Sequence, residues 1–241
     1  MLINLRNALM AGKRTPTAKD YVQNGLVAMW DGIENAGWGT HDATAGTWKD
    51  LTANGFDLTT ATGMSFVTWG ENCANISENS GLIAQGNFTF LDRKITVEIV
   101  TDITISGNNI GIVAINKQGT AYLRQTVGYR IAGNVIYVAC GGVQSSLGVN
   151  GRLNLVFASE EDGNGGVKIS SYRAGLLIGT KTITPTAAIT GGTVELFKTS
   201  ASNWSGGLNG KVYACRLYSR ALTAQEIAAN YAIDKARFGL S

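Results

Sequence analysis

The feature that most constrains the fold is a succession of short strand-like runs from Leu26 to Tyr218, with no helical pattern between them. The runs are rich in Val, Ile, Thr, Tyr and Phe, and they are separated by Gly, Asn, Ser and Asp. Such a succession is typical of an antiparallel sandwich or barrel. The predicted strands are residues 26–30, 65–69, 94–105, 109–115, 122–131, 135–140, 153–158, 167–173, 192–197 and 211–218.

The composition predicts tight turns between these strands rather than disorder. The chain has 31 glycines and only 2 prolines among 241 residues. The sequences EDGNGG at 161–166 and AGNV at 132–135 predict hairpin turns. In the run 94–105, alternation places Ile95, Val97 and Ile99 on one face of a strand.

Charge and cysteine content exclude several classes of protein. Charged residues make up 15% of the chain and the net charge is +3 without a block of like charges, so nucleic acid is not an expected partner. No apolar run approaches the ~20 residues needed to cross a bilayer, so no membrane insertion is expected. Cys73, Cys140 and Cys215 lack metal-binding spacing, and we expect them to be buried.

Both ends of the chain predict helices. Residues 1–12 place leucines at helical spacing before Gly12, which predicts a short arm that docks on its own domain or on a neighbouring subunit. At the other end, Thr223 and Glu226 have the spacing of a capping box, and Ile227, Tyr231 and Phe238 follow as an apolar stripe. We therefore expect an arm and linker at 1–24 and one sandwich domain at 25–241.

Two stretches resemble the ends of a known family. GLVAMWDGIENAGWGTHDATAGTWKDLTANGFDLT at 25–59 and GKVYACRLYSRALTAQEIAANY at 210–231 are similar to the opening and closing segments of laminin-G-like, concanavalin A-like jelly roll domains. The resemblance implies an all-β fold of two packed antiparallel sheets, whose first and last strands are neighbours and whose last strand leads into a short helix. It also implies binding of glycans or proteins, calcium in some members, and glycoside hydrolases among the wider relatives.

The aromatic residues are the candidate ligand contacts, because sugar rings stack on aromatic faces. Trp30 lies in an apolar strand and is expected in the core, whereas Trp38 is flanked by Gly37 and Gly39, which favours exposure. The alternative is a lid over the core, which is the more frequent role of a loop tryptophan. The candidates are Trp38, His41, Trp48, Trp69, Tyr129 and Trp204.

A calcium site is a further candidate, with Asp50 and Asn54 as ligands, because hard cations bind oxygen atoms on loops. Asp50 matches the loop aspartate of the resembling family. The acidic pair that many relatives carry before the last strand's Arg-Leu-Tyr is replaced here by Tyr213 and Ala214. The alternative is that the loop aspartates form turns with their own backbone.

Catalytic patterns are weak. A sandwich glycosidase needs two carboxylates about 5–9 Å apart in a groove. Glu98 and Asp102 would share one face of a strand, but an exposed or groove-facing structural role is sufficient for Glu98. His41 is the only histidine, and nothing resembles a nucleophile elbow or a phosphate loop. The sequence therefore predicts a protein that is not an enzyme and has no cofactor, apart from possible calcium.

These observations predict a non-catalytic module that recognises a glycan or protein, or has a structural role, in a surface assembly such as a phage virion or tail. The alternatives are a secreted bacterial carbohydrate-binding domain and, with less support, a glycoside hydrolase. Asn4, Arg6 and Asn7 interrupt the first residues, which do not resemble a secretion signal, and this favours a virion protein over a secreted one. The expected partners are a glycan or other subunits, with homo-oligomerisation through the arm and a location outside the cell or on a virion.

Overall fold

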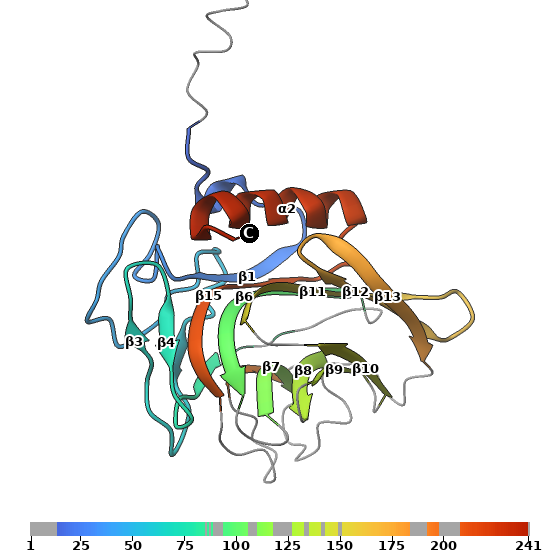
Figure 1. Ribbon diagram of the computed structural model, residues 1–241, viewed down its shortest axis with the longest axis horizontal. Coiled ribbons are helices and arrows are strands. Elements are labelled where there is room, and N and C mark those ends of the chain that lie inside the picture. Colours follow the sequence, from blue (N-terminus) through green and yellow to red (C-terminus); the bar gives the residue numbers. More distant parts are fainter. Residues whose placement is uncertain are drawn as a thin grey trace, which may run out of the picture.

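The computed structural model describes residues 14–84, 86, 88, 94–105, 110–117, 127–132, 135–140, 143–148, 151–183, 192–197 and 208–240. It is an all-β sandwich of two antiparallel sheets, with one α-helix on the outer face of the upper sheet (Figure 1). The first sheet has eight strands, in the order β13 (Leu176–Ile183), β12 (Val167–Arg173), β11 (Gly151–Glu161), β6 (Ile95–Ile105), β15 (Leu208–Tyr218), β4 (Ala74–Ile76) and β3 (Thr68–Trp69), with β1 (Leu26–Asp31) also paired to β15.

The second sheet has seven strands and forms the lower layer in Figure 1. Its pairs are antiparallel, like those of the first sheet. The strands follow the order β10 (Val143–Gly148), β9 (Val135–Cys140), β8 (Val127–Ala132), β7 (Ile110–Lys117), β14 (Gly192–Leu196), β5 (Leu82–Ala84) and β2 (Leu58–Thr60).

The predicted pairing of the first and last strands is confirmed. Strand β1 runs antiparallel to β15, and Trp30 lies opposite Cys215. Both predicted hairpins are also present, because Glu161 pairs with Val167 and Ala132 pairs with Val135. The sequence pattern missed β2, β4 and β5, which are only three residues long, and also β10 and β13.

The core lies between the two sheets. Ile95, Val97 and Ile99 of β6 all point into it, as their alternation predicts. Trp30 is fully buried in the same cluster, in agreement with its prediction as a core residue. Cys73 and Cys215 are buried, as predicted, whereas the side chain of Cys140 is outside the described part of the chain.

Helix α2 (Ala224–Phe238) begins at the predicted capping box. The Thr223 hydroxyl accepts a hydrogen bond from the Glu226 amide at 3.2 Å, and the Glu226 carboxylate accepts one from the Thr223 amide at 2.9 Å. The helix ends at Gly239, whose φ of 64° lies in the left-handed region. Ile227 and Phe238 are buried as predicted, but the buried face between them carries two polar residues that the expected apolar stripe did not include, Asn230 and Asp234.

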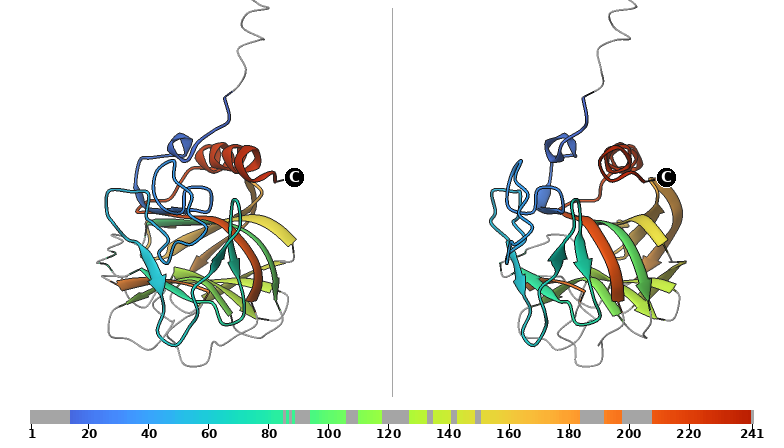
Figure 2. Two further views of the ribbon diagram at one scale, coloured as in Figure 1. Left: turned by 90° about the vertical axis from the view of Figure 1, so that its left-hand side faces the viewer. Right: turned by 60° about the vertical axis from the view of Figure 1, so that its left-hand side comes forward.

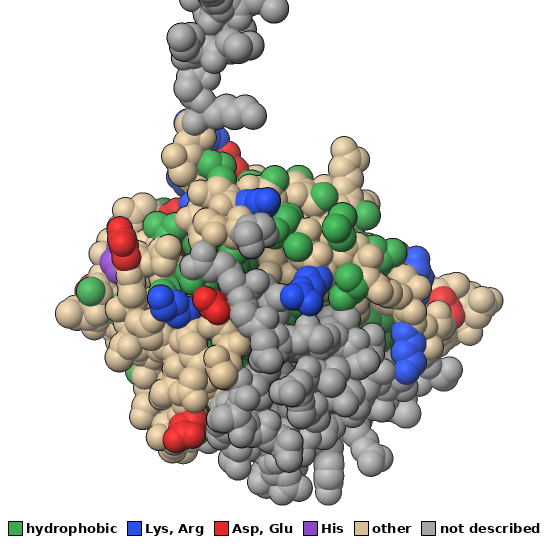
Figure 3. All heavy atoms as spheres, viewed as in Figure 1, with side chains coloured by type: hydrophobic (Ala, Val, Ile, Leu, Met, Phe, Trp, Pro, Cys, Tyr) green, Lys and Arg blue, Asp and Glu red, His purple; other side chains and the backbone are tan. Residues whose placement is uncertain are grey.

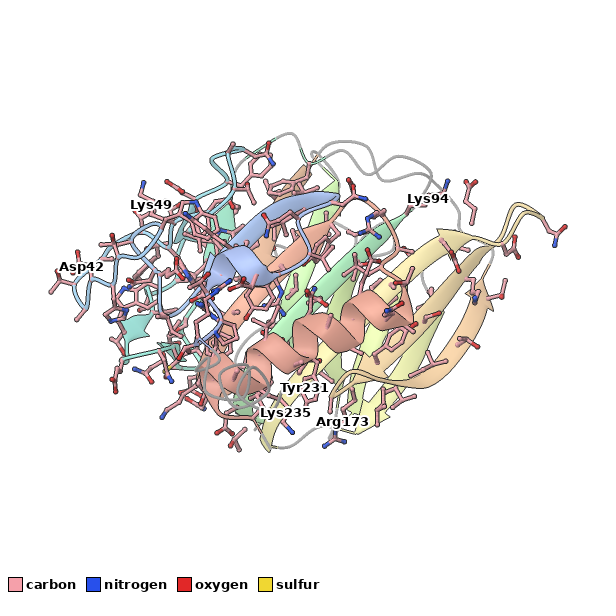
Figure 4. All side chains as sticks on the ribbon, turned by 90° about the horizontal axis from the view of Figure 1, so that it is seen from above. Asp42, Lys49, Lys94, Arg173, Tyr231 and Lys235 are labelled. Atoms are coloured by element: carbon pink, nitrogen blue, oxygen red, sulfur yellow. The ribbon has the colours of Figure 1, made fainter. Side chains whose placement is uncertain are left out.

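Those polar residues cover a buried cluster of charges on the outer face of the eight-stranded sheet. Arg216 of β15 donates to Glu98 of β6 at 2.7 Å and to Asp234 of α2 at 2.7 and 2.9 Å. The expectation that Glu98 is exposed or groove-facing is wrong, because its side chain is fully buried. Glu98 points away from the core between the sheets, because its carboxylate accepts a hydrogen bond from Asn230 of α2 at 2.9 Å. Helix α2 covers that face of the sheet (Figure 4).

The segment before β1 packs against the same helix. It contains the short 3-10 helix η1 (Ala18–Asp20), which lies beside α2 in both views of Figure 2. The Tyr21 hydroxyl donates to Asp234 at 2.7 Å, and the Val22 amide donates to the Asn230 side chain at 3.0 Å. Residues 17–22, expected within a linker, therefore contact the sandwich domain, whereas the predicted helix at 1–12 lies outside the described residues.

Candidate ligand-binding loop

The long connection between β1 and β2 carries the exposed candidate Trp38 at the tip of a tight turn. At the base of this turn, the Asn35 side chain and the backbone of Asp42 exchange two hydrogen bonds of 2.8 Å. Above them, the Ala36 amide donates to the Thr40 carbonyl at 3.2 Å. We refer to residues 35–42 as the Trp38 turn.

Trp38 itself is 41% exposed. The glycines on either side of it have φ values of 123° and 68°, a left-handed conformation that residues with a side chain rarely adopt. The ammonium group of Lys19, on η1, lies 5.2 Å from the centre of the Trp38 ring, which is within the range of a cation–π contact. The expected exposure of Trp38 is confirmed.

One carboxylate joins the Trp38 turn to the segment that carries Lys19. Glu34 is 7% exposed. One of its oxygens accepts from the Gly39 amide at 2.9 Å, and the other accepts from the Ala18 amide at 3.4 Å and from Arg237 at 3.3 Å. The residues next to Trp38 and Lys19 are thus bonded to the same side chain, which fixes the two segments relative to each other.

His41 lies on the Trp38 turn, and its side chain is exposed. Its Nδ1 is 3.1 Å from the Gly32 carbonyl, and a proton on Nδ1 makes this contact a hydrogen bond. In the neutral ring, Nε2 is then an acceptor. The next residue, Asp42, lies at the outer end of the loops (Figure 4) and accepts from the Thr44 amide and hydroxyl, which lowers the pKa of its carboxyl group.

The structure places two other tryptophan candidates below the surface. Trp48 is fully buried, and its indole N–H donates to the Asp31 carbonyl at 3.0 Å. Trp69 is half-buried, packs edge-on against Trp48 and donates to the Ala45 carbonyl at 2.7 Å. The interpretation of Trp48 as a sugar platform is wrong, because its ring is packed within the core. Trp69 therefore contacts the long connection at Ala45 and at Trp48.

The remaining aromatic candidates cannot be placed at this site. Tyr129 lies on β8 opposite Val138, but its side chain is outside the description. Trp204 is outside the described residues.

The geometry at Asp50 and Asn54 does not fit a calcium site. The Asp50 carboxylate accepts hydrogen bonds from the amides of Met29, Thr52 and Phe56 at 2.9–3.0 Å, and from the Thr52 hydroxyl at 2.7 Å. The Asn54 side chain donates its amide to the Val27 carbonyl at 2.7 Å. Oxygens that already face N–H and O–H donors are not directed at a cation, so the turn-forming alternative describes Asp50 better. Among the described residues, no group of three or more His, Cys, Asp or Glu side chains could hold a metal ion.

A cavity among the described residues lies beside the first turn of α2. It is a cavity of about 240 Å³ between this turn and strands β11 and β12. Leu222 and Ala158 supply apolar surface, whereas Ser170, Lys168 and Glu160 supply polar groups. Its charged pair, Lys168 and Glu160, forms an exposed contact of 3.2 Å. The cavity lacks an accessible tryptophan, so it is a weaker candidate for sugar stacking than the Trp38 turn.

The charged side chains of the described residues are scattered on the face shown in Figure 3 and do not form a single-sign patch there. Of the helices that the structure describes, none is long and apolar enough to span a membrane.

Comparison with known proteins gives a likeness of fold but no family. Neither a protein-family model nor a curated protein sequence matches this chain. Among solved structures, Trypanosoma rangeli sialidase in complex with sialic acid matches with a TM-score of 0.61 and 14% identity, over 94% of this chain and 35% of the sialidase. The botulinum neurotoxin type G receptor binding domain matches with a TM-score of 0.59 and 13% identity, over 88% of this chain and 52% of that chain.

These proteins share the fold of this chain. The likeness covers nearly all of the chain, and it agrees with the two-sheet sandwich described above. The chain spans about a third of the length of the sialidase and about half of the length of the toxin fragment. At these identities the comparison concerns fold alone, because one fold serves many functions.

Proposed function

We propose that this chain is a non-catalytic recognition module that binds a glycan through the Trp38 turn. The observation that carries the proposal is the 41% exposure of Trp38 on a turn whose backbone is held by hydrogen bonds within the loop and to Glu34. An indole ring gives a sugar a flat apolar surface on which to stack. A turn that is already ordered also loses little conformational entropy when the sugar binds.

Polar groups on the same turn suit the second requirement of a sugar site. Sugar hydroxyls need donors and acceptors at fixed positions beside the stacking surface. His41 has its ring oriented by the Gly32 carbonyl, which leaves Nε2 for an external partner. Thr40 is an exposed hydroxyl on the same turn. The fold likeness to a sialidase solved with sialic acid and to a receptor-binding domain supports a recognition role by analogy.

A non-catalytic role is supported by the location of Glu98. This is the carboxylate that a hydrolase would use on the sequence argument, but it is fully buried beneath α2 and bonded to Arg216. A substrate cannot reach it without displacement of the helix. The sialidase neighbour is an enzyme, so a hydrolase is the alternative, and an assay for turnover of any glycan that binds tests it. Turnover would contradict the non-catalytic role.

The wider setting of the module is part of the proposal. The resemblance of residues 25–59 and 210–231 to laminin-G-like domains and the low charge of 15% support a surface assembly, such as a phage virion or tail, outside the cell. A secreted bacterial carbohydrate-binding domain is the alternative. The apolar arm at 1–12 supports homo-oligomerisation in an assembly. Because residues 17–22 pack on α2, a deletion of residues 1–13 tests the arm without removing contacts of the domain. An unchanged oligomeric state, measured by light scattering, would contradict this part.

A glycan array tests binding at the Trp38 turn. The wild-type protein is expected to bind a defined set of glycans, and Trp38→Ala is expected to lower affinity by about tenfold or more, as for an aromatic hot spot. Leu177→Ala is the matched control, because Leu177 is 54% exposed on β13, at the far edge of the sheet. It should leave binding unchanged. The proposal fails if no glycan binds, or if Trp38→Ala binds as the wild type does.

A further inference from the structure

The contact between Lys19 and Trp38 extends this proposal from a binding site to a class of ligand. We infer that the Trp38 turn selects acidic saccharides, with Lys19 as the residue that recognises their carboxylate or sulfate group. This inference rests on the proposed function. It is carried by the position, the rigidity and the charge of Lys19.

The position of Lys19 places a cation over part of the stacking surface. Its ammonium nitrogen lies over the Trp38 ring, 5.2 Å from the ring centre. A sugar that stacks on the part of this face that Lys19 leaves open has its ring substituents next to that nitrogen, because a pyranose and an indole are similar in width. A neutral hydroxyl there accepts one hydrogen bond from the ammonium group, whereas a carboxylate or sulfate also gains the attraction between opposite charges, which makes its hydrogen bond stronger.

The backbone on either side of Lys19 is buried and bonded. Ala18 is fully buried and its amide donates to Glu34. Tyr21 is 2% exposed and its hydroxyl donates to Asp234 of α2. Because Glu34 also accepts from the Gly39 amide, one buried carboxylate fixes the separation of the Lys19 and Trp38 backbones. The fold thus fixes the distance between the two backbones, and from these the exposed side chains of Lys19 and Trp38 reach each other.

The charge of Lys19 is not neutralised by a described acid. Its neighbour Asp20 accepts from Arg14 at 2.8 Å and from the Thr17 amide at 2.7 Å. Glu34 is bonded to Arg237. Within the part of the chain that the structure describes, no carboxylate lies within ion-pair distance of the Lys19 ammonium, whose described contact is the Trp38 ring. A cation held beside an aromatic surface without an acidic partner is suited to an anionic ligand.

The test uses an array of neutral, carboxylated and sulfated glycans built on matched cores. The wild-type protein is expected to bind the acidic members in preference to their neutral counterparts. Lys19→Met keeps the aliphatic stem but removes the charge, and we expect it to lower affinity for acidic glycans about three- to fivefold, as for one exposed ion pair. Affinity for the neutral members should fall less, because they lose a hydrogen bond but no attraction between opposite charges.

Three controls separate recognition from packing. Lys19→Arg should retain the acidic preference, because it keeps the positive charge. Lys181→Met removes the same charge from an exposed position on β13, the edge strand on the side of the sheet away from the long connection, and should have no effect (Figure 1). The acidic preference of the wild type should also decline between about 0.05 and 0.5 M salt, because salt screens exposed charges.

The outcomes distinguish this inference from the proposal beneath it. If glycans bind through Trp38 without an acidic preference, or if Lys19→Met retains that preference, the role of Lys19 is wrong and the proposed function stands. If no glycan binds, both are wrong. If acidic glycans bind but Trp38→Ala has no effect, the site lies elsewhere and both are again wrong.

Discussion

Arg216 on β15 donates two hydrogen bonds, of 2.9 and 2.7 Å, to the carboxylate of Asp234 on helix α2, and both side chains are fully buried. The Arg216 guanidinium also lies 3.9 Å from the centre of the Tyr21 ring and bonds Glu98. The Arg216 guanidinium therefore joins four parts of the fold, which are α2, β15, β6 and the segment before β1. Apolar contacts flank this cluster on both sides, around Ile227 and around Phe238.

Asp234→Ala is expected to destabilise the protein by about 3–5 kcal/mol, because removal of one member of a buried ion pair leaves the other charge unpaired. The measurement is urea-induced unfolding followed by circular dichroism. Lys235→Ala is the control, since Lys235 is the next residue and is exposed. Its effect should stay within about 0.5 kcal/mol. A loss below about 1 kcal/mol for Asp234→Ala would show that the cluster does not fix the helix.

The environment of Glu98 predicts that the stability of the protein depends on pH. Burial raises the pKa of its carboxyl group, against the opposing effect of Arg216. One of its oxygens, Oε1, has no hydrogen-bond partner among the described residues. An acid whose pKa is higher in the folded protein stabilises the fold below the unfolded pKa of about 4.3, and loses that contribution as pH rises through the folded pKa.

Glu98→Gln removes this titration. From pH 4 to 7, the free energy of unfolding of the wild type should fall relative to that of the variant, by ~1.4 kcal/mol for each unit by which the pKa is raised. Urea unfolding of both proteins at several pH values measures the difference. A difference that is constant with pH would contradict the prediction, whatever the stability of the variant at any one pH.

Glu226 predicts the opposite dependence. Hydrogen bonds from Arg220 and from Thr223 lower the pKa of its carboxyl group to about 2. Its contribution is therefore present above the unfolded pKa and is lost as pH falls toward 2. Glu226→Gln should lower the free energy of unfolding by about 0.5–1 kcal/mol at pH 7, through the loss of its ion pair with Arg220, and by much less near pH 2. Thermal unfolding at both pH values tests this, and an equal loss at both would exclude a charge effect.

The hydrogen bonds of Asp50 predict that the stability of the protein does not depend on calcium but does depend on the Asp50 carboxylate. In Asp50→Asn, the new amide N–H faces an N–H or O–H group that now donates to the carboxylate. This leaves a buried polar group unsatisfied and should lower the free energy of unfolding by about 1–3 kcal/mol. Millimolar calcium or a chelator should leave the Tm of the wild type unchanged. If calcium raises the Tm of the wild type and Asp50→Asn abolishes this rise, the prediction is wrong and Asp50 is a calcium ligand.

Which residues lie at the surface was harder to predict than where the strands lie. Trp38 and Trp48 occupy the same connection, and the sequence makes both candidates. Gly37 and Gly39 mark Trp38 as exposed, but no local signal shows that Trp48 packs under Trp69. No local pattern marks Lys19 as a binding residue, because the Trp38 ring that it contacts is nineteen positions away and the two segments are joined through Glu34.

Periodicity and turn residues were sufficient to locate most of the longer strands, the two hairpins and the capped helix, because each depends on neighbours a few positions apart. Such local patterns do not determine whether Glu98 is exposed or buried. A glutamate that alternates with Val97 and Ile99 is compatible with solvent or with burial, and the choice depends on a helix more than a hundred positions later in the chain. Burial depends on which layers pack together. Glu98 is buried because α2 covers the sheet, where Asp234 bonds Arg216 and Asn230 bonds Glu98.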